Sequence, residues 1–140
     1  MAANTRFTSI ECACPQCVSM CQHATCLPTP EEARKLIAAG FADRLARYEW
    51  NTPAPRAIGP APAGLEGKTL QTTNLGRCTF FKNDRCELHT LGLKPLEGRI
   101  AHHSRPWVAV RTEALRTWGG KRYQSVSAAL DKAVSQTLPA

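Results

Sequence analysis

Residues 12–26 read CACPQCVSMCQHATC and contain five of the seven cysteines in this chain of 140 residues. Cys14 and Cys17 are separated by two residues, and the tight turn between them lets two thiolates reach one metal ion at about 2.3 Å. Cys21 follows Cys17 by four positions, so one helical turn would place both side chains on the same face. This spacing indicates a fold organised around a bound metal.

A second group of possible ligands lies much later in the chain, at Cys78, Cys86 and His89. Two local ligand groups joined by a long loop are typical of a structural metal site, because metal binding offsets the entropy of closing that loop. We therefore expect one pool of metal ligands: Cys14, Cys17, Cys21, Cys26, Cys78, Cys86 and His89.

Other roles for the cysteines were weighed against metal binding. A free cysteine is often a buried and inert side chain, and for Cys12 this alternative stays open. A catalytic Cys–His pair is a further alternative, but no feature of the sequence singles out one nucleophile among seven cysteines.

The composition points to a thin core and an intracellular setting. Only 6% of the residues are aromatic, whereas ten prolines and nine glycines imply long irregular stretches. A fold of this kind often needs a bound metal or a covalent cross-link to stabilise it. The first residues lack the apolar region of a signal peptide, and no apolar run approaches the roughly 18–20 residues that cross a bilayer. We expect a cytoplasmic protein without membrane contact, whose thiols stay reduced.

The formal net charge of +7 raises the possibility of a nucleic-acid partner. The 18 lysines and arginines are scattered along the chain, however, and metal-bound thiolates would cancel part of their charge. The sequence also lacks the helix spacing of a zinc finger and the aromatic motif of an RNA-recognition sheet. We expect weak, salt-sensitive and sequence-independent binding at most.

Local patterns predict several short elements. Thr29-Pro30-Glu31-Glu32 carries a capping box and should open a helix that ends at Gly40. We expect a second helix over residues 41–48, a proline-rich loop over 51–64 and another loop over 92–98. Ser104-Arg105-Pro106 should open a helix with Trp107 and Trp118 on its buried face, and a last helix is expected over residues 125–137.

Residues 78–89 predict a β-hairpin with a two-residue turn at Asn83-Asp84. In that register Phe81 pairs with Cys86 and Cys78 with His89. Side chains alternate between the two faces of a strand, so a regular hairpin could not bring Cys78 and Cys86 to one ion. We therefore expect either a bulge in the hairpin or two metals in a multinuclear cluster.

These elements predict a small, metal-stabilised α+β fold, with several short helices around the cysteine cluster, one short hairpin and long Pro/Gly loops. We expect one domain over residues 1–140, with the cysteine-cluster core at about 10–104 and C-terminal helices at about 105–138.

The motifs also resemble a known family. They are Cys14-x2-Cys17-x3-Cys21-x4-Cys26, Pro28-Thr29-Pro30-Glu31-Glu32-Ala33, Gly76-Arg77-Cys78-Thr79-Phe80-Phe81 and Cys86-Glu87-Leu88-His89. In this order they resemble the YkgJ-type cysteine-cluster family, also described as a CxxCxxCC or zinc- or iron-chelating domain, over roughly residues 12–103. The resemblance implies a metal-chelating domain without a known reaction.

Two departures from that family bear on the ligand set. The third cysteine spacing is x3, and the chain has no Cys-Cys doublet. The family also tends to end on Arg-Pro-x2-Cys-Arg, where this chain reads Lys94-Pro95-Leu96-Glu97-Gly98-Arg99. Gly98 therefore stands where a cysteine is expected, and His102 or His103 just downstream could replace that ligand.

Three functions are compatible with these features. The first is a metal-binding protein, for zinc or iron, that acts as a chelator, a carrier or a metal-stabilised interaction module. The second is an iron–sulfur redox protein or radical-enzyme accessory, since such clusters also take four cysteines. The third is a zinc-stabilised nucleic-acid binder. We expect none of these to be an enzyme in its own right, although the sequence leaves that open.

Overall fold

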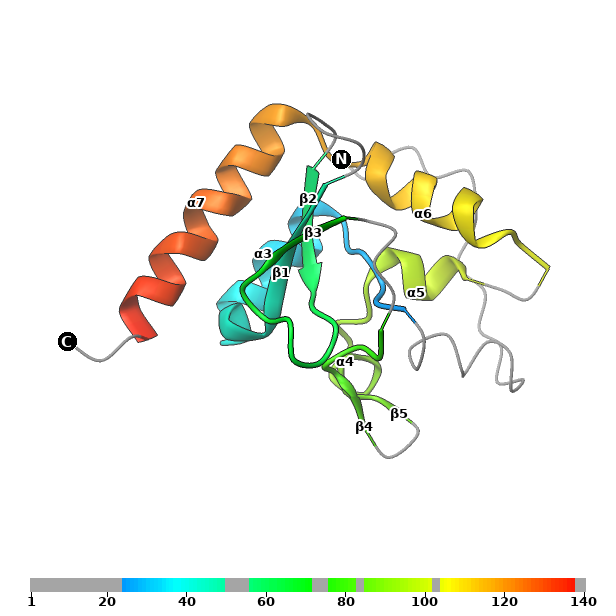
Figure 1. The fold of residues 1–140 in the computed structure, drawn as a ribbon, viewed down its shortest axis with the longest axis horizontal. Helices are drawn as coiled ribbons and strands as arrows, with labels where there is room; N and C mark the ends of the chain where they lie inside the picture. The colour runs from blue at the N-terminus through cyan, green and yellow to red at the C-terminus, as the bar shows by residue number, and fades with distance from the viewer. Residues whose placement is uncertain (1–23, 50–55, 72–75, 83–84, 102–103, 138–140) are drawn as a thin grey trace.

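The computed structural model describes residues 24–49, 56–71, 76–82, 85–101 and 104–137. These residues form an α+β fold with five α-helices, a three-stranded sheet in the order β2-β1-β3 and a separate two-stranded hairpin, β4-β5 (Figure 1). The α+β expectation is confirmed. None of the described helices combines the length and apolarity needed to cross a membrane.

The first described helix, α3 (Pro30–Ala38), begins and ends as the sequence predicts. Thr29 caps it: the Glu32 N–H donates to Thr29 Oγ1 at 3.2 Å, and the Thr29 N–H donates to Glu32 Oε1 at 2.8 Å. After the helix, Gly40 has a φ of 94°, a conformation that side chains rarely adopt. The capping box and this glycine are local signals, which is why they could be read from the sequence.

The helix expected over residues 41–48 is wrong. A short 3-10 turn, η1 (Ala42–Arg44), leads into strand β1 (Leu45–Glu49). β1 is the central strand: it pairs antiparallel with β2 (Arg56–Pro60) and parallel with β3 (Thr69–Gln71). Leu45 and Tyr48 are spaced as on a helix face, but both are buried because the strand is covered on either side.

Strand β2 lies in the segment predicted to be a proline-rich loop. It is an edge strand that ends at Pro60, a position where the sheet tolerates a residue without an N–H. Gly59 lies directly beneath the segment that follows Cys26, because a Cβ there would be 2.6 Å from Pro28 Cδ. The sheet therefore supports the chain that carries the cysteine cluster.

The hairpin of β4 (Phe81–Lys82) and β5 (Arg85–Cys86) has the predicted register, with Phe81 opposite Cys86. It is shorter than expected. A helical turn, α4 (Glu87–Thr90), begins directly after Cys86, and Cys78 forms an isolated bridge with Pro62. The predicted pairing of Cys78 with His89 is therefore wrong, and the argument built on a regular ladder between them does not apply.

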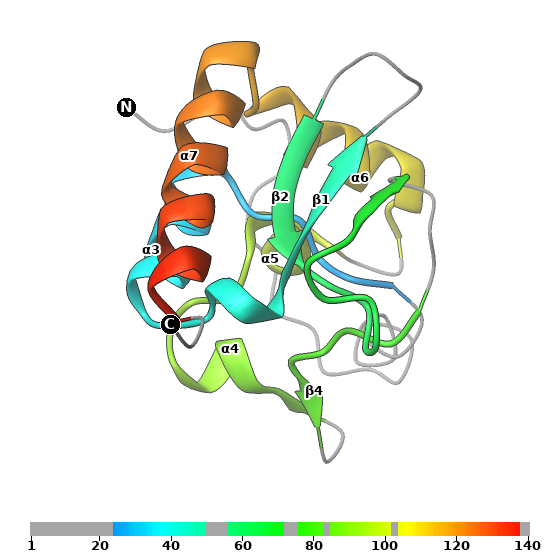
Figure 2. The same ribbon diagram turned by 60° about the vertical axis from the view of Figure 1, so that its left-hand side comes forward.

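Three helices complete the fold. α5 (Leu96–Ile100) begins within the segment predicted to be a loop over residues 92–98, whereas α6 (Trp107–Arg116) follows Ser104-Arg105-Pro106 as predicted. α7 (Gly120–Thr137) begins five positions before the expected start at residue 125. It packs against α3 and β2 (Figure 2). Trp118 is buried, as expected, and Trp107 is half-buried.

Candidate metal centre around Cys26

The segment 24–28 enters the interior of the molecule immediately after the cysteine-rich stretch. All five of its residues are buried, and Leu27 is fully so. The Trp118 indole Nε1 donates to the Pro28 carbonyl at 2.9 Å, which ties the segment to the end of α6. Cys26 is therefore a fixed, buried thiol rather than a side chain on a surface loop.

The Cys26 sulfur faces α5 at Gly98. A Cβ built on Gly98 would lie 3.2 Å from Cys26 Sγ and 3.1 Å from Lys94 Cε. A side chain at this position would thus be in direct contact with the sulfur. Gly98 is the residue that stands in place of the terminal cysteine in the family that the sequence resembles.

A buried ion pair brackets Cys26 on both sides. Glu97 and Arg111 are each 1% exposed, with Arg111 Nε 2.6 Å from Glu97 Oε2 and Arg111 Nη2 2.7 Å from Glu97 Oε1. Arg111 Nη2 also donates to the Thr25 carbonyl at 2.7 Å, and the Leu27 N–H donates to Glu97 Oε1 at 3.0 Å. The residues before and after Cys26 are therefore held by the two partners of one pair.

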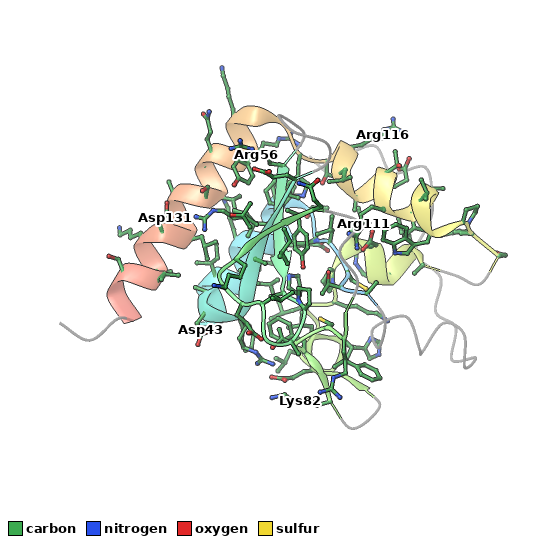
Figure 3. The ribbon with its side chains drawn as sticks, in the orientation of Figure 1. Asp43, Arg56, Lys82, Arg111, Arg116 and Asp131 are labelled. Carbon is green, nitrogen blue, oxygen red and sulfur yellow. The ribbon has the colours of Figure 1, made fainter. Side chains whose placement is uncertain are left out.

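Arg111 projects from α6 close to α5 (Figure 3). Burial of the guanidinium acts to lower its pKa, but the charge of Glu97 and its hydrogen bonds outweigh burial, so the pKa of Arg111 is raised. Charge on Cys26 acts in the same direction. The guanidinium also lies over the ring of Trp107, 4.8 Å from its centroid.

The Tyr48 hydroxyl extends this hydrogen-bond network beyond Thr25. It donates to the Pro60 carbonyl at 2.5 Å, and the Thr25 hydroxyl lies 3.0 Å away and supplies the hydrogen of the second bond. Burial raises the pKa of Tyr48 well above its ordinary value, and charge on Cys78 contributes in the same direction. Hydrogen bonds thus join Arg111, Thr25 and Tyr48 in one buried network beside Cys26.

Arg44 holds the hairpin region against the sheet next to Cys78. Its guanidinium makes a bidentate pair with Glu87, at 3.0 Å to each oxygen, and donates to the Thr79 carbonyl at 3.0 Å. It also lies over Phe80, 4.0 Å from the ring centroid. The hydrogen bond that Arg44 donates to Glu87 is the main cause that raises the pKa of Arg44, and charge on Cys78 adds to it.

The structure places only part of the predicted ligand pool. Cys26 and Cys78 are buried, Cys86 is half-buried, and His89 is exposed on α4. Cys14, Cys17 and Cys21 lie outside the described residues, as do Cys12, His102 and His103. Within the described ranges, no three Cys, His, Asp or Glu side chains are grouped to hold a metal ion. A site that includes Cys26 therefore needs ligands from outside the described ranges, where the N-terminal cysteines and His102 and His103 lie.

The roles of Glu97 and Arg111 were not predicted from the sequence. A signal for Arg111 was present, because it lies four positions after Trp107, on the face of α6 that was expected to be apolar. Glu97 was quoted only as part of the motif that ends at Arg99. Comparison of the chain with protein-family models, with curated proteins and with solved structures finds no match.

Proposed function

We propose that this protein is a metal-binding cysteine-cluster protein that holds zinc or iron and acts as a chelator or a metal-stabilised interaction module. Cys26 joins Cys14, Cys17 and Cys21 in the ligand set, and Cys78, Cys86 and His89 form the second part of the pool. The observation that carries the proposal is the buried Cys26 sulfur, which would lie 3.2 Å from a Cβ at position 98.

This proximity supports the resemblance to the cysteine-cluster family from an independent direction. The family motif predicts a ligand at position 98, and the backbone of α5 puts that position within 3.2 Å of a thiol from the other end of the motif. Two positions that belong to one metal site should be close in space. Here they are close, although they are far apart in the sequence.

The donor chemistry also fits the proposal. Thiolates are the preferred ligands of structural zinc and of iron–sulfur clusters. Cys21 precedes Cys26 by five positions, so at about 3.3–3.6 Å per residue it can be no more than about 18 Å away. Cys17 and Cys14 precede Cys26 by nine and twelve positions, and these longer tethers also let them fold back to a site that includes Cys26.

Rigid support of the ligand strengthens the case further. Glu97 and Arg111 hold the backbone on either side of Cys26, and a fixed ligand loses little freedom when the metal binds. Supporting residues of this kind orient ligands in known metal sites. A fully buried ion pair is costly to form, and here it is placed at the cysteine that leads into the cluster.

Anaerobic purification followed by elemental analysis tests the proposal. We expect zinc or iron at a fixed ratio to the protein, with brown colour if the metal is an iron–sulfur cluster and none if it is zinc. Cys26→Ser should lower the metal content sharply, because it removes one thiolate. The matched control is Ala24→Ser, which places the same hydroxyl at a buried position of the same segment and should keep the metal. Wild-type protein without metal, or full metal content in Cys26→Ser, would contradict the proposal.

A further inference from the structure

A pocket of about 210 Å³ lies between α3 and α7, the two helices that lie side by side in Figure 2. Its apolar lining comes from Pro30 and Val126, which are both buried. The complete lining consists of Pro30, Glu31, Arg34, Lys121, Arg122, Ser125 and Val126. None of these residues belongs to the proposed metal site.

The lining carries an excess of positive charge. Arg34 from α3 and Lys121 and Arg122 from α7 are exposed, and none of the three forms an ion pair in the part of the chain that the structure describes. Glu31 is the one acidic residue of the lining. Three positive charges against one negative charge leave an excess of two, which is the charge of a phosphate dianion.

One of the arginine side chains reaches across the pocket. The Arg34 guanidinium donates to Ser125 Oγ, so it reaches from α3 to α7 and is held there. Because the Ser125 oxygen accepts this bond, its own hydrogen can be donated to a bound oxygen atom. Arg122 donates to the Thr117 carbonyl at 3.1 Å, which restricts its position as well. The Arg34 guanidinium and the Ser125 hydroxyl are thus held at the pocket before any ligand arrives.

The same cations are unfavourable for the helix that carries them. Lys121 and Arg122 lie in the first turn of α7, which contains no acidic residue, whereas the first turn of α3 contains Glu31 and Glu32. Positive charge near the start of a helix opposes the helix dipole. A bound anion would remove this repulsion and the mutual repulsion of the three cations.

We propose that this pocket binds a phosphate group. The double charge favours phosphate over a carboxylate, and arginine and lysine are the side chains that recognise it in proteins. The phosphate is either the free ion or part of a small phosphate monoester, since both present the same oxygens. The concave shape and the small volume favour these ligands over the backbone of a nucleic acid.

Isothermal titration of the full-length protein with inorganic phosphate, and separately with glycerol phosphate, tests the proposal at constant ionic strength. We expect saturable binding of one phosphate per chain by at least one of the two probes, and the tighter probe identifies the source. Arg34→Gln and Arg122→Gln should each weaken binding about fivefold to tenfold, as expected for the loss of one charge-assisted contact.

Two further variants separate a built site from general surface charge. Glu31→Gln removes the opposing carboxylate and should strengthen binding, whereas Lys35→Gln, on α3 but outside the pocket, should leave it unchanged. Lack of saturation at about 10 mM phosphate would refute the proposal. The proposal would also be refuted if Lys35→Gln weakened phosphate binding as much as Arg34→Gln. It would likewise be refuted if an oligonucleotide bound much more tightly than phosphate and that binding depended equally on Lys35 and Lys132.

Discussion

Replacing Glu97 by glutamine would remove the negative charge from the buried pair that brackets Cys26. It would also remove one hydrogen bond, because an amide nitrogen would replace Glu97 Oε2, which accepts from Arg111 Nε at 2.6 Å. The amide oxygen can still accept the Leu27 N–H, which lies 3.0 Å from Glu97 Oε1. The Arg111 guanidinium would then remain buried, at 1% exposure, without the charge of Glu97. Breaking a buried pair from one side typically costs about 3–5 kcal/mol. That is a large part of the roughly 5–15 kcal/mol that stabilises a whole domain.

Urea unfolding followed by circular dichroism measures this loss. At a slope of about 2 kcal/mol per molar urea, the midpoint should fall by about 2 M. Asp131→Asn is the matched control, because Asp131 on α7 (Figure 3) also pairs with an arginine, Arg47, at 2.6 Å. Asp131 is 72% exposed, so its loss should cost less than about 1 kcal/mol. If Glu97→Gln costs no more than Asp131→Asn, the pair does not hold Cys26 in the way described here.

Two further predictions address neighbouring features. Gly98→Cys should form a disulfide with Cys26 when metal-free protein is oxidised, and should retain metal longer against a chelator when the protein is reduced. Gly119→Cys, where a Cβ meets no atom within 4 Å, should do neither, and equal behaviour of the two variants would refute the contact. The hydrogen bond from Arg44 lowers the pKa of the Glu87 carboxyl in the folded protein. The Glu87 carboxylate therefore takes up a proton more readily in the unfolded chain than in the folded one. The stabilisation is present above the ordinary pKa of 4.5 and is lost as the pH falls through the folded value. Glu87→Gln should flatten the acid side of a stability–pH curve, and an unchanged slope would show that the bond does not persist in solution.

The elements that the sequence predicted correctly are those with local signals. The capping box at Thr29, the glycine at position 40 and the pairing of Phe81 with Cys86 each depend on residues close together in the sequence. Strand β1 shows the opposite case, since Leu45 and Tyr48 fit a helix face and a strand equally well. Its identity depends on pairing with β2 and β3, and the pattern of β1 alone carries no information about those partners.

The candidate site was predictable to a similar degree. The cysteine-rich stretch led to the prediction that Cys26 is a ligand, because the chemistry of thiolates and metals is local to the motif, and this stays a prediction. The support of Cys26 by Glu97 and Arg111 depends on how α5 and α6 pack against the segment around Leu27. Charged residues are mostly exposed, so a sequence gives little reason to place two of them in the interior.

Thermal unfolding before and after verified removal of metal tests the central claim most directly. Structural zinc contributes roughly 10–16 kcal/mol in finger peptides, which is comparable with the roughly 5–15 kcal/mol net stability of a domain. If the cysteine cluster stabilises this fold, the metal-free protein should lose its cooperative transition or melt at a far lower temperature, and zinc or iron should restore it. An unchanged circular dichroism spectrum and an unchanged melting temperature after complete metal removal would contradict the account.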